Sequence, residues 1–253
     1  MRYGEIIELG SHRLMCGDAT SRDDVMRLVD GVKVDLVLTD PPYGKSIHAG
    51  YNRFKGGWLP REKLDRDKER YSQEHYRAIK NDKDTSAMKG HYDIATGLTD
   101  KLIVWGGNYF TDILPPSKCW LVWNKEQALP NHADCELAYT SLKAPVKFYR
   151  QHWNGCIREG SKNLNPSPSL HLSQKPVELH MKILEDFTQP GDIILDCFGG
   201  SGTTLIACEM TGRKCLMMEI SPEYCDIIRE RYEKLQDFTP LFRDIKEEET
   251  CPA

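Results

Sequence analysis

Hydrophobic and polar positions follow two periods along the chain, one typical of buried strands and the other of helices. Short apolar runs predict strands at residues 12–16, 34–39, 102–105, 120–123, 193–197 and 214–218. Helical spacing and end signals predict helices at 21–31, 177–187 and 203–210, and a last helix that begins at Pro222. Apolar strands that alternate with helices indicate an α/β fold with a mainly parallel sheet, covered by helices on both faces.

One segment interrupts this alternation. Residues 45–100 are polar, charged and poor in aliphatic side chains, and they follow directly on a strand end. Connections between elements are usually about 4–6 residues long, so this segment is too long for an ordinary turn. The chain is therefore expected to be a single domain, 1–253, with an inserted loop or small subdomain at 45–100.

Composition narrows the class of protein. Hydrophobic residues make up 40% of the 253 positions and charged residues 28%, a balance typical of globular proteins. No apolar run approaches the roughly 20 residues that span a bilayer, so a membrane protein is not expected. The nine cysteines include no CxxC pair, which argues against a disulfide framework and a zinc site. Acidic residues near the start, where a signal peptide would be apolar, favour a cytoplasmic protein.

The charges are unevenly distributed around a formal net charge of −4. Residues 45–92 hold 12 basic and 7 acidic side chains, and residues 141–182 hold 7 and 2. Two basic stretches are compatible with a polyanion bound on one face. Solvated surface loops would show the same composition, so charge leaves both interpretations open.

The first motif with a chemical meaning is Asp40-Pro41-Pro42-Tyr43, directly after the strand at 34–39. Ligands of open α/β sheets bind beyond the carboxyl ends of strands. The prolines fix the backbone, which aims two acceptors, the Asp40 carboxylate and the Pro41 carbonyl. A group with two N–H donors matches this pair, and Tyr43 offers a flat face for stacking. The motif therefore predicts a pocket for a nucleobase with an amino group, unless it is only a proline-rich turn.

The second motif is the glycine turn, residues 196–204 (DCFGGSGTT), between a predicted strand and a helix. Glycines let the backbone approach a ligand, and the helix N-terminus favours a negative group. Glu219 ends the next strand, 19 residues after Gly200, a spacing that suits an acidic residue binding ribose hydroxyls. The turn lacks a phosphate-binding lysine of the P-loop type, so a nucleoside is favoured over ATP. Alternatively, Glu219 is only a negative charge near the start of the last predicted helix, where the helix dipole stabilises it.

These motifs resemble those of the amino-methylating DNA methyltransferases that use S-adenosylmethionine (SAM). DPPY is similar to their catalytic motif, and the glycine turn to their SAM motif, often written DPFAGSGTT. The catalytic motif comes first, as in the permuted β-type group of N6-adenine and N4-cytosine methylases. Residues 14–19 (LMCGDA) and 171–177 (HLSQKPV) are similar to two further stretches of this group. Residues 106–110 and 119–125 are similar to phage and prophage members.

The resemblance implies a Rossmann-like, SAM-dependent methyltransferase fold with a circularly permuted motif order. It implies SAM as cofactor, with S-adenosylhomocysteine as product. The catalytic residues would be Asp40, Pro41, Pro42 and Tyr43. The implied cofactor-binding residues are Asp18, Ala19, Lys175, Asp196, Phe198, Gly200, Ser201, Gly202, Thr203 and Glu219. Asn108, Tyr109 and Lys125 follow strand patterns and are further candidates for the pocket. Leu172 and Cys197 depart from the usual motifs, but neither change removes a polar contact.

The implied reaction is site-specific methylation of the N6 amine of adenine in double-stranded DNA, with the base flipped out of the duplex. N4-cytosine methylation, an RNA substrate and a non-catalytic SAM- or DNA-binding subunit stay open as alternatives. Target recognition is expected to be shared between residues 45–100 and the short segment 148–172. A restriction-modification role and a homodimer are further expectations from the family.

Overall fold

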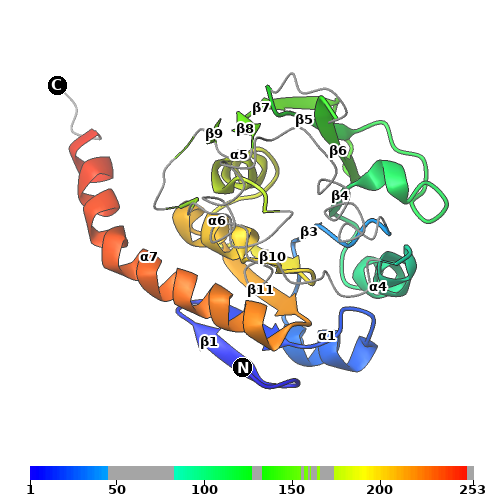
Figure 1. Cartoon of the computed structure of the whole chain (residues 1–253), viewed down its shortest axis with the longest axis horizontal. Coiled ribbons are helices and arrows are strands. Elements are labelled where there is room, and N and C mark those ends of the chain that lie inside the picture. The colour runs from blue at the N-terminus through cyan, green and yellow to red at the C-terminus, as the bar shows by residue number, and fades with distance from the viewer. Residues whose placement is uncertain are drawn as a thin grey trace, which may run out of the picture.

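The computed structural model describes residues 1–44, 83–126, 133–154, 157–158, 160, 164–165 and 174–249. These residues form a nine-stranded sheet in the order β1-β2-β11-β10-β3-β4-β6-β5-β7 (Figure 1). All neighbouring strands are parallel except the pairs β1–β2, β4–β6 and β5–β6. The prediction of a mainly parallel sheet is therefore confirmed. The strands are β1 (Ile6–Leu9), β2 (His12–Cys16), β3 (Leu36–Thr39), β4 (Leu102–Trp105), β5 (Trp120–Asn124), β6 (Cys135–Thr140), β7 (Lys147–Arg150), β10 (Ile193–Asp196) and β11 (Lys214–Glu219).

Helices cover both faces of the sheet, as the alternation of strands and helices predicts (Figure 1). Side chains alternate along β3, so that Leu36 and Leu38 join one buried cluster and Val37 joins the other. The first cluster also contains side chains of α5 (Val177–Phe187), α6 (Thr203–Thr211) and α7 (Pro222–Glu249). The second contains side chains of α1 (Arg22–Val29) and α4 (Ser86–Thr96). Each strand of the centre is thus buried on both sides.

The sequence pattern misses strands that lack a clear apolar run. The strand β6 reads CELAYT and runs against its neighbours, while β1 and β7 are short strands at the two edges. A two-stranded ribbon, β8 (Trp153–Asn154) and β9 (Ile157–Arg158), follows β7. The strands β6 and β7 are held by pairing with β4 and β5, which a local pattern does not encode, while β1, β8 and β9 are too short to show a clear period.

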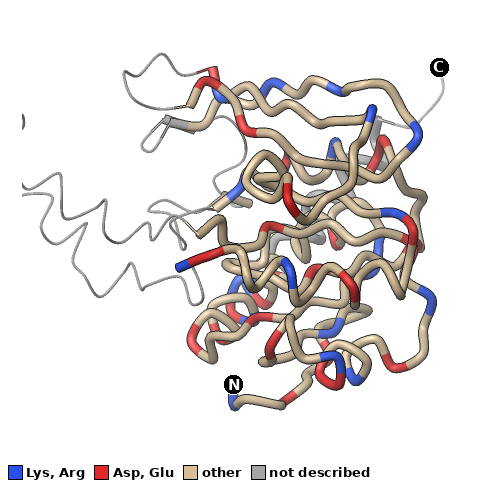
Figure 2. The backbone as a smooth tube through the Cα atoms, turned by 90° about the vertical axis from the view of Figure 1, so that its right-hand side faces the viewer, with Lys and Arg blue, Asp and Glu red and all other residues tan. Residues whose placement is uncertain are grey.

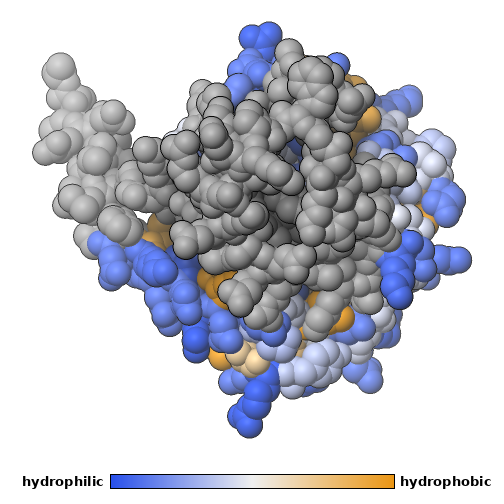
Figure 3. Space-filling view, viewed as in Figure 1, coloured by the Kyte–Doolittle hydropathy of each residue, from blue (hydrophilic) through white to orange (hydrophobic). Residues whose placement is uncertain are grey.

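Most of the two segments predicted to contact DNA lies outside the described residues. Of residues 45–100, the structure describes 83–100, which contain α4. Of residues 148–172, it describes β7, β8, β9 and a few further positions. Basic and acidic positions are interspersed along the described backbone (Figure 2), and on the face shown in Figure 3 the described apolar residues appear as separate spots. None of the described helices is long and apolar enough to cross a membrane.

The parallel order β2-β11-β10-β3-β4 brings five carboxyl ends to one edge of the sheet. Asp18 follows β2, Glu219 ends β11, Asp196 ends β10, and Asp40 follows β3. The two motifs are more than 150 residues apart in sequence, and their strands β3 and β10 are hydrogen-bonded neighbours. Strand pairing therefore brings the two motifs together in space although they are far apart in sequence.

A buried carboxylate fastens β3 to β10 at this edge. The Asp196 carboxylate accepts hydrogen bonds from the Thr204 hydroxyl (2.6 Å), the Thr39 hydroxyl (2.9 Å) and the Phe198 amide (3.1 Å). Burial raises the pKa of Asp196 to about 6, although these hydrogen bonds oppose the rise. One side chain thus connects the end of β3, the glycine turn and the first turn of α6.

This elevated pKa predicts a pH-dependent contribution to stability. Between about pH 4 and pH 6 the folded protein holds a proton on Asp196 that the unfolded chain has released. This contribution is present at low pH and is lost as the pH rises through about 6. Asp196→Asn cannot ionise at this position. The free energy of unfolding of the wild type, relative to that of Asp196→Asn, should therefore rise by about 1 kcal/mol from pH 7.5 to pH 5.

Urea unfolding at several pH values measures this difference. Asp237→Asn, at an exposed position of α7, is the matched control for the removal of one carboxylate. A difference between wild type and Asp196→Asn that stays constant with pH would contradict the prediction.

Candidate active site

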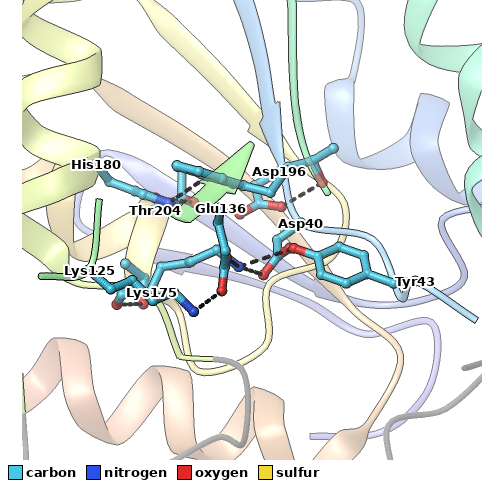
Figure 4. A network of polar contacts seen from close by, with 11 residues as sticks. Asp40, Tyr43, Lys125, Glu136, Lys175, His180, Asp196 and Thr204 are labelled. Atoms are coloured by element: carbon cyan, nitrogen blue, oxygen red, sulfur yellow. Dashed lines mark hydrogen bonds and ion pairs between the residues drawn. The ribbon is translucent and has the colours of Figure 1, made fainter. Parts of the chain in front are cut away.

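The catalytic motif predicted from sequence lies immediately beyond β3, with both oxygens of Asp40 already engaged. The Tyr43 hydroxyl donates to Asp40 Oδ1 (2.5 Å), and the Lys175 ammonium donates to Asp40 Oδ2 (2.6 Å) (Figure 4). Lys175 Nζ also donates to the Tyr43 hydroxyl oxygen (3.3 Å). Burial and the negative charge of Asp40 raise the pKa of Tyr43 well above its ordinary value. Asp40, Tyr43 and Lys175 thus form a closed triangle of hydrogen bonds.

The ring of Tyr43 is held by the turn that follows β4. It stacks on the ring of Tyr109, with the centroids 5.1 Å apart, and meets Phe110 edge-on at 6.1 Å. Gly106 makes this possible, because a Cβ at that position would lie 2.2 Å from the Tyr43 ring. Gly106 also adopts a φ of 68°, which favours glycine. The sequence candidate Tyr109 therefore lies beside the catalytic motif, with part of its ring exposed.

Lys175 connects this triangle to a second carboxylate that the sequence analysis missed. Its Nζ lies 3.3 Å from Glu136 Oε2, and Glu136 Oε1 pairs with Lys125. The Lys175 side chain is only 5% exposed, and its Nζ lies over the Trp105 ring, 5.4 Å from the centroid. The result is a chain of alternating charges, Lys125–Glu136–Lys175–Asp40, which is named the charge chain below (Figure 4).

The two inner members of the charge chain stay ionised despite their burial. Burial by itself would lower the pKa of Lys175, but Asp40 and Glu136 outweigh it, and the pKa lies above its ordinary value. Burial would likewise raise the pKa of Glu136, but Lys175 and Lys125 outweigh it, and the pKa is lowered. Glu136 lies on β6 and belongs to no motif, so only the pairing of β6 with β4 could reveal it.

Lys175 precedes the glycine turn in sequence and contacts the Asp40-Pro41-Pro42-Tyr43 motif in space. The resemblance assigns Lys175 to the cofactor, whereas in the structure its ammonium contacts Asp40 and Glu136. Its carbonyl oxygen accepts a hydrogen bond from the Thr203 hydroxyl (3.2 Å) at the start of α6. Residues 171–173 of the same stretch lie outside the described residues.

The predicted nucleoside site lies at the neighbouring strand ends. Glu219 accepts hydrogen bonds from the amides of Gly200 (2.8 Å) and Ser221 (2.9 Å), which hold its carboxylate beside the glycine turn. Asp18, at the end of the adjacent strand β2, accepts from the amide (2.9 Å) and hydroxyl (2.8 Å) of Thr20. Acidic acceptors and backbone amides suit a nucleoside with free ribose hydroxyls. These residues therefore fit the cofactor that the resemblance implies.

Several of the other predicted cofactor residues are engaged by contacts within the protein. The Ser201 carbonyl accepts from buried Arg231 (2.8 Å), and a Cβ on Gly202 would lie 3.1 Å from Ile228. The Ala19 carbonyl bonds to His91 Nδ1 (3.0 Å), and the same imidazole meets the Phe198 ring edge-on. These contacts connect the turn to α7 and α4.

A hydrogen-bonded path behind the charge chain joins the two halves of the site. Trp105 Nε1 donates to His180 Nε2 (3.1 Å), and His180 Nδ1 lies 3.2 Å from the Thr204 hydroxyl, which also donates to Asp196. Burial, together with the charges of Lys175 and Arg231, lowers the pKa of His180 to about 3, so the ring is neutral at physiological pH. Sequence reasoning did not single out His180 or Thr204.

Comparison with solved structures confirms the Rossmann-like methyltransferase fold. The N4-cytosine-specific PvuII DNA methyltransferase superposes with a TM-score of 0.56 at 14% identity, over 93% of this chain and 94% of that chain. The M1.HpyAVI–SAM complex superposes with a TM-score of 0.50 at 19% identity, over 86% and 98%.

Comparison of sequences finds similar proteins among the DNA methylases. The family model described as DNA methylase (N6_N4_Mtase) matches residues 118–230. The putative methylase YubD of Escherichia coli K12 is 28% identical over 212 residues, 79% of this chain and 82% of that protein. The type II methyltransferase M.HpaI of Haemophilus parainfluenzae is 25% identical over 264 residues, 87% of this chain and 73% of that enzyme. The resemblance to DNA methylases that the motifs predict is thus confirmed.

Proposed function

We propose that this protein transfers a methyl group from SAM to the exocyclic N6 amine of adenine in double-stranded DNA, with the base flipped out of the duplex. The observation that carries the proposal is the pairing of β3 with β10, fastened by the hydrogen bond between Thr39 and Asp196. This pairing brings the Asp40-Pro41-Pro42-Tyr43 motif, which is the proposed amine-binding motif, next to the glycine turn of the proposed nucleoside site. A methyl donor and a methyl acceptor could then meet without a change in the sheet.

The cofactor side of the proposal depends on Glu219, Asp18 and the glycine turn. Two backbone amides hold Glu219, and this supports the proposal that it accepts hydrogen bonds from ribose hydroxyls. Asp18 would contact the base of the cofactor, as the resemblance implies. When bound, SAM supplies an electrophilic methyl group. The residues of this chain only need to orient the cofactor and to keep the methyl group accessible from Asp40.

The target side depends on Asp40 and the Pro41 carbonyl. The lone pair of an adenine amine is delocalised into the ring, so the amine is a poor nucleophile. Two acceptors that each bind one N–H favour a tetrahedral nitrogen and stabilise the positive charge that develops there. A preorganised group of this kind contributes about 2.7–4 kcal/mol. Tyr43, stacked on Tyr109, supplies an aromatic surface at the place where a flipped base would enter.

N4-cytosine methylation is the second candidate, because the PvuII enzyme with a similar fold acts on cytosine N4. Cytosine also presents an exocyclic amine, so the acceptor pair alone does not separate the two bases. DPPY favours adenine, since the cytosine enzymes more often have Ser in place of Asp. The role of 45–100 and 148–172 in recognition, the homodimer, the phage-like origin, the restriction-modification role and the cytoplasmic location all stay predictions.

The identity of the product base tests the proposal directly. Purified protein is incubated with SAM and unmethylated genomic DNA, and the digested nucleosides are analysed by mass spectrometry. We expect N6-methyladenine to rise. N4-methylcytosine instead would support the second candidate. No modified base, despite measurable SAM binding, would contradict DNA methylation and favour an RNA substrate or a non-catalytic subunit.

Asp40→Ala tests the catalytic assignment. Turnover should fall by at least about 10²–10³-fold, because one of the two acceptors for the amine is lost. SAM affinity, measured by isothermal titration, should be retained, and Lys175 keeps Glu136 as a partner. Asp112→Asn, at an exposed position of the turn after β4, is the matched control. Loss of SAM binding in Asp40→Ala would mean that Asp40 serves the cofactor or the fold.

Glu219→Gln tests the nucleoside site. Hydrogen bonds to a charged acceptor contribute about 1.5–3 kcal/mol each, so SAM affinity should fall by about 10–100-fold. The KM for SAM should rise more than kcat falls, because the substitution does not touch the amine-binding motif. Glu230→Gln removes the same charge from an exposed position on α7 and should leave SAM affinity unchanged. Equal SAM affinity in wild type and Glu219→Gln would place the ribose elsewhere.

A further inference from the structure

We propose that Glu136 is a positioning residue for methyl transfer, which neutralises Lys175 and draws its ammonium partly away from Asp40. The inference rests on the proposed function, because it concerns the ability of Asp40 to accept the target amine. Glu136 does not itself contact the amine-binding motif by any hydrogen bond recorded among the described residues. It acts through Lys175, which lies between the two carboxylates.

The Lys175 ammonium lies closer to Asp40 than to Glu136. Its Nζ lies 2.6 Å from Asp40 Oδ2 and 3.3 Å from Glu136 Oε2, so the closer partner is the proposed catalytic carboxylate. The Lys175 side chain is almost fully buried, which leaves little water to screen its charge. Lys125 holds the other oxygen of Glu136 and completes a neutral set of two acids and two bases (Figure 4).

A buried ammonium beside Asp40 is useful for structure but unfavourable for the reaction. Lys175 orients Asp40 and, through its carbonyl, joins the catalytic motif to Thr203 of α6. Methyl transfer, however, places positive charge on the target nitrogen, and a second positive charge nearby opposes this step. The negative charge of Glu136 compensates for Lys175, so that the field at Asp40 remains favourable to a developing cation.

Glu136 also affects the donors of Lys175. An ammonium has three N–H groups, and a buried one directs them at whatever acceptors are near. Asp40 and the Tyr43 hydroxyl are two such acceptors, and both belong to the place where the target amine would bind. Glu136 Oε2 lies 3.3 Å from the same ammonium without a hydrogen bond, so it attracts Lys175 by its charge. This attraction competes with that of Asp40 and thereby leaves lone pairs of Asp40 available to the N–H groups of the base.

Glu136→Gln tests this role, because it keeps the shape of the side chain and removes its charge. We expect kcat to fall by about tenfold, less than for a group that touches the amine itself, with SAM affinity retained. Glu136→Asp, which keeps the charge, should recover most of kcat. Glu185→Gln, at an exposed position on α5, removes a charge outside the charge chain and should leave kcat unchanged. A kcat equal to that of the wild type in folded Glu136→Gln would overturn the inference.

Two measurements separate this role from a purely structural one. If Glu136 acts through Lys175, Glu136→Gln should have little further effect on kcat in a Lys175→Met background, whereas independent effects would add. The difference in kcat between the wild type and Glu136→Gln should also become smaller as the pH rises. Glu136 is one of the two carboxylates that raise the pKa of Lys175, so its loss lowers this pKa. At high pH, Lys175 of the variant would be neutral, and a neutral lysine needs no compensating charge. Additive effects, together with a deficit that does not change with pH, would overturn the inference.

A readout without turnover keeps this inference distinguishable from the proposed function. NMR titration of the Lys175 side chain, with its signal identified by loss in Lys175→Met, reports the charge directly. We expect Lys175 to lose its proton at lower pH in Glu136→Gln than in the wild type. If the wild type transfers no methyl group, the proposed function fails. If Lys175 titrates at the same pH in the wild type and in Glu136→Gln, the effect of Glu136 on Lys175 is overturned, whatever the outcome for methyl transfer. If Glu136→Gln does not fold, kcat of the charge-balanced Lys175→Met/Glu136→Gln is compared with kcat of Lys175→Met, and a further loss in the double variant would overturn the inference.

Discussion

The arrangement of this site depends on one buried carboxylate at the junction of two strands. Asp196 receives hydrogen bonds from Thr39 at the end of β3, from Phe198 in the glycine turn and from Thr204 in α6. A buried carboxylate costs free energy unless donors satisfy it, so this cluster is stable only when all three segments are in place. The same condition that stabilises Asp196 therefore fixes the end of β3, which precedes Asp40, relative to the glycine turn.

The charge chain extends this logic to the side chains of the site. Lys175 is buried between Asp40 and Glu136, and breaking a buried pair by removing one partner typically costs about 3–5 kcal/mol. Such a pair is weak evidence for stability in itself, because desolvation offsets much of the attraction. Its value here is positional. The Lys175 ammonium fixes the carboxylate of Asp40. The same ammonium lies over the ring of Trp105, which donates a hydrogen bond to the neutral His180.

The fold also explains how motifs far apart in the chain become neighbours. In the sheet, β10 lies between β11 and β3, so the ends that carry Glu219 and the glycine turn are next to the end that precedes Asp40, whichever comes first in the chain. Binding at the carboxyl ends of parallel strands depends on the order of strands in space. The match to the DNA methylase family covers residues 118–230, which include the glycine turn and Glu219, while Asp40 lies outside this range.

The sequence by itself determined the strands with strong apolar runs, the helix caps and the two motifs, because these depend on residues close together along the chain. Asp40, Glu219 and the glycine turn could be identified in this way, since a polar residue after a buried strand marks a sheet edge. Only the tertiary structure decided that Glu136, on a strand held by long-range pairing, lies beside Lys175, and that Lys175 contacts Asp40. It also decided that Asp196 is enclosed by donors of the chain itself. Contacts between elements that are distant in sequence, such as Thr39–Asp196 and Lys175–Asp40, depend on strand order, and no local pattern of residue types encodes that order.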